Sequence, residues 1–152
     1  MDILFYRLTG STLEATVTTF AERTLQRGGR VVVKGAGAAR LDQLDAHLWA
    51  YRDDSFLPHG KAGGAHDDQQ PVLLTTAAAR PNAAGTLLLV DGARFDAESV
   101  TGLDRVALIF DGNDAEATAA ARTDWKAVTE TGLTAVFWAE EDGRWVEKAR
   151  SG

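Results

Sequence analysis

RVVVKGAGAARLDQLDAHLWA, residues 30–50, is the stretch of the chain that decides its fold class. Its valine triplet, residues 31–33, is apolar at every position, as in a strand whose two faces are both buried. A glycine-rich turn at residues 35–37 comes next. Leucines at helical spacing then follow: Leu41, Leu44 and Leu48. A buried strand that turns tightly into a helix is the repeating unit of a parallel α/β sheet.

Further strands and helices are predicted on both sides of this unit. Apolar runs predict strands at residues 2–8, 72–75, 86–90 and 105–110, and helical periodicity predicts helices at 12–27 and 114–130. Asn113, with Glu116 three residues later, resembles the capping box that begins a helix. Segments 134–139 and 144–148 flank an Asp-Gly turn and predict a hairpin. We therefore expect an α/β fold: a single three-layer domain over residues 1–152, with a mostly parallel, Rossmann-like central sheet, helices on both faces and a C-terminal hairpin.

Charge and composition restrict the partners and the compartment. The net charge is −6 and the pI is near 5.0, so the average field repels phosphate backbones and an anionic partner needs a local basic patch. The chain has no cysteine, which excludes disulfides, thiol nucleophiles and Cys-based metal sites. No apolar run approaches the roughly 20 residues that cross a bilayer, and the N-terminus does not resemble a signal peptide. We expect a cytoplasmic protein with no membrane contact.

The sequence contains no complete catalytic, cofactor or metal motif. Gly35 and Gly37 lie between a strand and a helix, as a phosphate-binding turn does, but Arg40 stands where a dinucleotide fingerprint needs a small residue. The histidines lack the spacing of a metal site and are best explained by surface or loop packing: His47, His59 and His66. We expect no cofactor, no metal and no catalysis. The alternative is a small nucleotide-binding α/β enzyme that uses Gly35 and Gly37.

One face of the predicted helix at 114–130 suits an acidic peptide. At about 100° per residue, five side chains share this face: Thr118, Arg122, Trp125, Lys126 and Thr129. Arginine binds carboxylates and an indole binds apolar groups, so an acidic peptide with an aromatic anchor would fit. The alternative is a solvated cationic face with Trp125 half-buried at its edge, because Asp124 and Glu130 dilute the positive charge.

A loop after Trp49 carries three residues of a predicted apolar ridge: Phe56, Leu57 and Pro58. The proline favours an extended conformation at Leu57 and removes a backbone donor, so the ridge is fixed and partly exposed. Exposed apolar ridges usually meet a partner. The alternative is that Phe56 folds back and closes the core. Trp49 itself is expected to fill the core beneath the loop.

Three segments together resemble a known family. Leu48-Trp49 followed by residues 55–59 (SFLPH) resembles the signature of the chi subunit of bacterial DNA polymerase III, an accessory protein of the clamp-loader assembly. Residues 121–126 (ARTDWK) are similar to the Ala-Arg-x-x-aromatic-Lys pattern on the last long helix of that family. Residues 5–8 (FYRL) are similar to its opening. The resemblance spans nearly the whole chain.

The resemblance implies a function in DNA replication. It implies a noncatalytic subunit of the DNA polymerase III holoenzyme, a DNA-directed DNA polymerase and nucleotidyltransferase, that links the clamp loader to single-stranded-DNA-binding protein. In that family the last long helix helps to bind the acidic C-terminal tail of single-stranded-DNA-binding protein. That tail ends in a phenylalanine with a free carboxylate. The loop contributes to the contact with the psi subunit, which connects chi to the clamp loader. The residues implied here are Thr118, Arg122, Trp125 and Lys126 for the tail, and Phe56, Leu57 and Pro58 for a psi-like subunit, with DNA contacted only indirectly.

Overall fold

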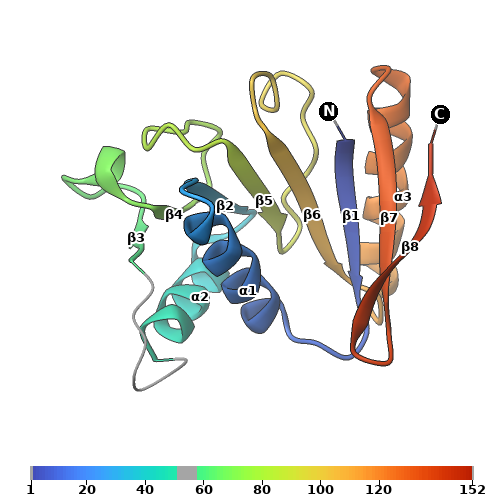
Figure 1. Ribbon diagram of the computed structural model, residues 1–152, viewed down its shortest axis with the longest axis horizontal. Coiled ribbons are helices and arrows are strands. Elements are labelled where there is room, and N and C mark those ends of the chain that lie inside the picture. The colour runs from blue at the N-terminus through green and yellow to red at the C-terminus, as the bar shows by residue number, and fades with distance from the viewer. Residues whose placement is uncertain (1, 51–57, 152) are drawn as a thin grey trace.

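The computed structural model describes residues 2–50 and 58–151, which form one eight-stranded sheet and three α-helices (Figure 1). The strands are β1 (Asp2–Leu8), β2 (Val31–Gly35), β3 (Gly60–Lys61), β4 (Val72–Thr75), β5 (Thr86–Val90), β6 (Arg105–Asp111), β7 (Thr134–Glu141) and β8 (Arg144–Arg150). The helices are α1 (Leu13–Gln26), α2 (Ala38–Ala50) and α3 (Ala115–Glu130), and a 3-10 turn, η1, covers Asp67–Gln69. The expected α/β fold class is confirmed.

The sheet is parallel except at its C-terminal edge. Its strand order is β3-β4-β2-β5-β6-β1-β7-β8, and within the described residues the antiparallel pair is the β7–β8 hairpin. β2 lies between β4 and β5, where all three residues of the valine triplet are at most 1% exposed. The predicted buried parallel strand is therefore confirmed. β1 lies between β6 and β7, and pairs parallel with both.

Helices cover the two faces of the sheet and complete three layers. α1 and α2 lie on one face and α3 lies on the other (Figure 1). On the first face, Val31, Val33 and Leu44 belong to the core beneath α1 and α2. On the second face, Val32 and Val128 belong to a separate core that includes α3. Each strand of the central sheet thus contributes alternate residues to two cores, as a sheet covered on both faces requires.

Two local predictions are wrong. The residue that caps α3 is Asp114 and not Asn113: the Asp114 carboxylate accepts hydrogen bonds from the backbone N–H groups of Glu116 and Ala117 at 2.9 and 3.3 Å. Asn113 instead donates to the backbone carbonyl of Thr9 at 3.2 Å. Both residue types cap helices well, so the sequence did not distinguish these neighbours.

Trp49 does not fill the core, because its side chain is 57% exposed. α2 buries Leu41, Leu44 and Leu48, and the next residue lies about 100° around the helix from Leu48, away from that buried stripe. The indole ring lies 5.0 Å, centroid to centroid, from the ring of His59. The Phe56 and Leu57 predictions lie outside the described residues. In the part of the chain that is described, no helix is both long and apolar enough to cross a membrane.

Candidate peptide-binding site

A pocket of about 400 Å³ lies between α3 and the sheet. Four aromatic rings line it, from three strands and the helix: Phe5, Phe110, Phe137 and Trp125. Two arginines line it as well, Arg7 on β1 and Arg122 on α3. The remaining lining residues are small: Thr118, Ala121 and Ala149. The pocket is therefore an apolar hollow with two guanidinium groups.

Strand alternation explains why these residues from β1, β6 and β7 converge. Successive side chains of a strand point to opposite faces, so Phe5 and Arg7 share the face on which α3 packs. Arg7 is in register with Phe110 of β6, and Phe5 is in register with Phe137 of β7. Paired residues in a parallel sheet point the same way, so three adjacent strands present one aromatic and cationic surface to α3.

Trp125 closes the side of the pocket formed by α3. Its indole packs against the ring of Phe5, with the centroids 5.3 Å apart and the planes inclined by 58°. Trp125 is therefore half-buried, because one side of the ring is in the core. The rest of the indole is left to line the pocket. A ring held in this way offers apolar contact area with little further loss of side-chain entropy.

Arg7 is held in place by packing but has no carboxylate partner among the described residues. Its guanidinium carbon lies 5.3 Å from the centroid of the Phe137 ring, a cation–π contact. Its aliphatic stem lies against Gly112, where the Cβ of any larger residue would be 2.5 Å from Arg7 Cγ. The Nε atom is buried and has no hydrogen-bond partner within the same part of the chain. A buried donor without an acceptor is unfavourable, and the oxygen of a bound anion would satisfy it.

The acidic residue nearest this face does not dilute its charge, which corrects one expectation. Asp124 is only 3% exposed, and Arg94 donates to its carboxylate through Nε at 3.0 Å and Nη2 at 2.8 Å. This ion pair raises the pKa of Arg94, through hydrogen bonding to Asp124 and its charge. The Asp124 charge is neutralised on the buried side of α3. Arg122, by contrast, is exposed and makes no ion pair among the described residues.

The structure brings together three of the four residues expected to bind the tail. Thr118, Arg122 and Trp125 line the pocket, whereas Lys126 is exposed on α3 and does not line it. Pro58, from the predicted ridge, is exposed. Five strand residues that complete the pocket were not predicted from the sequence: Phe5, Arg7, Phe110, Phe137 and Ala149. The FYRL segment held a signal for the first two, since Phe5 and Arg7 are two residues apart on one strand.

The glycine turn that suggested a nucleotide has a packing role. A Cβ on Gly35 would lie 3.1 Å from Cδ2 of Leu41, so the missing side chain lets α2 pack closely on β2.

In the loop between β1 and α1, the backbone N–H groups already have an acceptor, the side chain of Glu140. The Glu140 carboxylate accepts hydrogen bonds from the N–H groups of Thr9, Gly10 and Ser11 at 2.9, 3.2 and 3.1 Å, and from Ser11 Oγ at 2.6 Å. Burial raises the pKa of Glu140, but these hydrogen bonds lower it by more, so it lies below its ordinary value.

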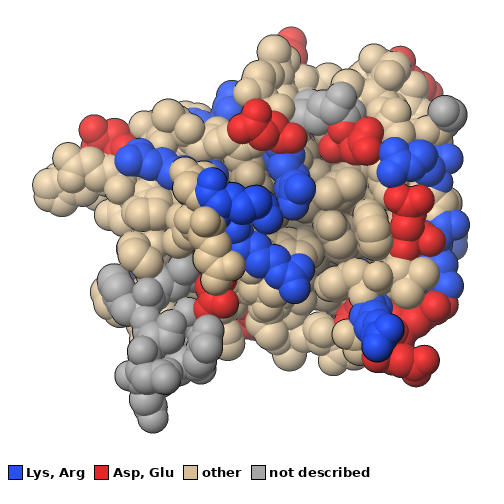
Figure 2. Space-filling model, viewed as in Figure 1, with Lys and Arg blue, Asp and Glu red and all other residues tan. Residues whose placement is uncertain are grey.

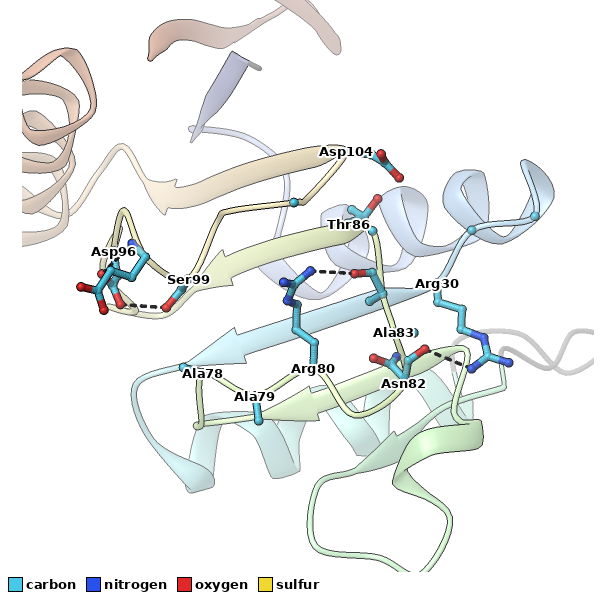
Figure 3. A pocket seen from close by; sticks show the side chains of 16 residues that line it. Arg30, Ala78, Ala79, Arg80, Asn82, Ala83, Thr86, Asp96, Ser99 and Asp104 are labelled. Atoms are coloured by element: carbon cyan, nitrogen blue, oxygen red, sulfur yellow. Dashed lines mark hydrogen bonds between the residues drawn. The ribbon is translucent and has the colours of Figure 1, made fainter. Parts of the chain in front are cut away.

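A larger hollow, of about 1060 Å³, lies where β2 and β5 begin (Figure 3). Its two arginines already hold the surrounding loops together. Arg30 donates to the carbonyls of Asp68 and Asn82, each at 3.0 Å. Arg80 donates to the carbonyls of Ala84 and Thr101 at 3.1 and 3.3 Å. Because these guanidinium groups are used internally, the hollow offers less to an anionic ligand than the pocket beside α3 does.

Comparison with known proteins identifies the family. The family described as DNA polymerase III chi subunit, HolC, matches residues 1–136, and no curated protein matches the chain. The matched range covers most of the 152 residues, including every pocket residue except Phe137 and Ala149. The chain therefore belongs to the DNA polymerase III chi subunit family, which confirms the resemblance and gives the protein an accessory role in DNA replication.

Proposed function

We propose that this chi-family protein binds the acidic C-terminal tail of single-stranded-DNA-binding protein in the pocket beside α3. In this way it would link the DNA polymerase III clamp loader to protein-coated single-stranded DNA. One observation carries the proposal: two arginines that have no carboxylate partner among the described residues, Arg7 and Arg122, line a pocket whose walls are otherwise mostly aromatic. Such a pocket combines an apolar site for a ring with charged donors for a carboxylate.

A terminal phenylalanine meets both requirements of this pocket. Its ring would lie between Trp125 and Phe137, which line the pocket from α3 and β7. Its carboxylate would accept hydrogen bonds from Arg122 and from the buried Nε of Arg7, which has no acceptor among the described residues. Lys126 is exposed on the same helix and would attract the acidic residues that precede the phenylalanine. Thr118 lines the same pocket, where it would contact the tail, and its hydroxyl donates to the carbonyl of Asp114 at 3.0 Å.

The proposed mechanism is tethering rather than chemistry. Many tails are displayed along one coated strand, so a weak contact becomes effective because the local tail concentration is high. We further propose that the chain acts as a single domain over residues 1–152 and is not catalytic by itself. Purified protein should then show no nucleotidyl transfer, nuclease or nucleotidase activity. Turnover by homogeneous protein that is lost on mutation of Lys34 or Arg40 would contradict this.

A second contact, with a psi-like clamp-loader subunit, is proposed for Phe56, Leu57 and Pro58. The first two lie outside the described residues, so the support comes from their neighbours. Pro58 is exposed, and Trp49 at the end of α2 is 57% exposed, with its ring 5.0 Å from that of His59, the residue after Pro58. Large exposed apolar side chains near one another mark protein interfaces, where aromatic residues often contribute most of the binding energy.

The tail proposal is tested by changing the peptide and leaving the protein unaltered. A fluorescent peptide with acidic residues and a C-terminal phenylalanine should bind, as measured by anisotropy, and should bind more tightly as salt is lowered, because exposed charges are screened over about 10 Å at 0.1 M. Amidation of the terminal carboxylate should weaken binding most. A scrambled peptide of the same charge is the control. Equal affinity for the amidated and free peptides would contradict the proposed carboxylate site.

A further inference from the structure

A second basic cluster lies on the face of the sheet opposite the tail pocket. Arg23 and Arg27 extend from α1, and Arg105 is the first residue of β6. The three surround a small hollow of about 120 Å³. Figure 2 shows basic side chains gathered in the middle of the face that carries α1. We call these three residues the arginine cluster.

The guanidinium groups of this cluster are available to a ligand. All three residues are exposed, and none of the described residues that line the hollow is acidic. Within the described chain, Arg23 and Arg105 make no ion pair, and the Arg27 guanidinium makes only a long hydrogen bond, 3.5 Å, to Thr24 Oγ1. In a protein of net charge −6, three neighbouring cations without acidic partners form the kind of local patch that an anion requires.

An aromatic surface adjoins the arginine cluster. Tyr6 lies in the same hollow, and its ring is 4.8 Å from Phe20, 5.0 Å from Trp145 and 6.1 Å from Trp138, centroid to centroid. Burial raises the pKa of Tyr6, while the charges of Arg105 and Arg23, which line the same hollow, oppose that shift. Both tryptophans are half-buried on the β7–β8 hairpin. Figure 1 shows no described helix over this hairpin on the α1 face.

We propose that the arginine cluster and the adjoining indoles of Trp138 and Trp145 bind single-stranded DNA directly. Guanidinium groups contact phosphates, and exposed indole surface stacks on unpaired bases; this combination is typical of sites for single strands without sequence preference. A duplex would present the phosphates but not the base faces. The proposal goes beyond the tail contact, which reaches DNA only through another protein. Because the two surfaces lie on opposite faces of the sheet, the protein can bind a peptide tail and a single DNA strand at the same time.

The test measures binding of a fluorescent 20-nucleotide oligo(dT) by anisotropy at several salt concentrations. Each phosphate contact on a single strand contributes about −0.7 to the slope of log affinity against log salt, so three arginines should give a slope of about −2. The variant Arg23→Gln/Arg27→Gln/Arg105→Gln should bind about tenfold or more weakly, with a slope close to zero. Quenching of intrinsic tryptophan fluorescence by the oligonucleotide should accompany binding to the native protein.

A matched control separates a local site from general charge. Arg40→Gln/Lys61→Gln/Lys148→Gln lowers the net charge equally, but at residues that are ion-paired elsewhere on the surface. This control should keep its affinity and slope, and circular dichroism should show both triple variants folded. Equal losses in the two triple variants would overturn the proposal.

Two further outcomes bear on the proposal. A 20-base-pair duplex that binds as tightly as oligo(dT) would overturn it, as would the absence of binding to oligo(dT) at low salt. Arg122→Ala, on the opposite face, should weaken tail binding by roughly ten- to a hundredfold and leave oligo(dT) binding unchanged. The failure of this proposal is therefore distinguishable from the failure of the tail proposal.

Discussion

Replacement of Arg122 by alanine should weaken tail binding by roughly ten- to a hundredfold. A hydrogen bond to a charged group is worth about 1.5–3 kcal/mol, and each 1.4 kcal/mol is about tenfold in affinity. Arg122 makes no ion pair in the described part of the free protein, so binding breaks no existing ion pair of this side chain. Folding should hardly change, because exposed substitutions away from special features usually stay within about 0.5 kcal/mol and both residues favour helices.

The assay is anisotropy of a labelled tail peptide at low and moderate salt, with thermal unfolding as the check on folding. Lys126→Ala is the matched control, since it removes the same charge from the same helix outside the pocket. An exposed charge pair is worth about 0.2–1 kcal/mol, so this control should lose at most about fivefold, mainly at low salt. Unchanged affinity in Arg122→Ala, or equal losses in both variants at all salt concentrations, would refute the reasoning.

Three other predictions concern Glu140, Gly112 and Phe56. The pKa of Glu140 is below its ordinary value of 4.5 in the folded protein, so its contribution to the unfolding free energy should be present above that pH and lost as the pH falls through the lowered pKa. In urea unfolding, the free energy of unfolding of Glu140→Gln should therefore change less with pH in this acidic range than that of the native protein. Identical pH profiles for the two proteins would contradict this prediction. Gly112→Ala should displace the Arg7 stem and reduce both tail affinity and stability, the latter by about 1–3 kcal/mol; unchanged tail affinity would show that Arg7 is not used. Phe56→Ala should leave the thermal midpoint nearly unchanged and weaken clamp-loader association in a pull-down, whereas a stability loss of about 3–5 kcal/mol would assign Phe56 to the core.

Local patterns in the sequence were enough to predict the fold class. The valine triplet at 31–33 is apolar on both faces, and it lies inside the parallel sheet between β4 and β5. The periodicity of residues 114–130 correctly placed Thr118, Arg122 and Trp125 together. These predictions succeeded because helix and strand periodicities are properties of neighbouring residues.

The pocket itself could not be predicted, because it depends on strand order. Phe110, Arg7 and Phe137 come from three strands that are far apart in the sequence and adjacent in the sheet. Nothing in the local pattern of β1 indicates that β6 and β7 are its neighbours. The charge of Asp124 was misjudged for a similar reason, since its partner Arg94 is 30 residues away. Trp49 is exposed because of its position around α2, whereas its hydrophobicity alone suggested that it would be buried.

Photocrosslinking locates the terminal residue of the bound tail and tests the proposed site most directly. In the probe, a benzoylphenylalanine replaces the C-terminal phenylalanine of the acidic peptide, and the adducts on the native protein are mapped by mass spectrometry. We expect adducts on α3 between Thr118 and Trp125, and on Phe5 or Phe137, with competition by the unlabelled peptide. Competable adducts confined to α1, α2 or the β8 strand away from this pocket would contradict the proposal that the tail binds beside α3.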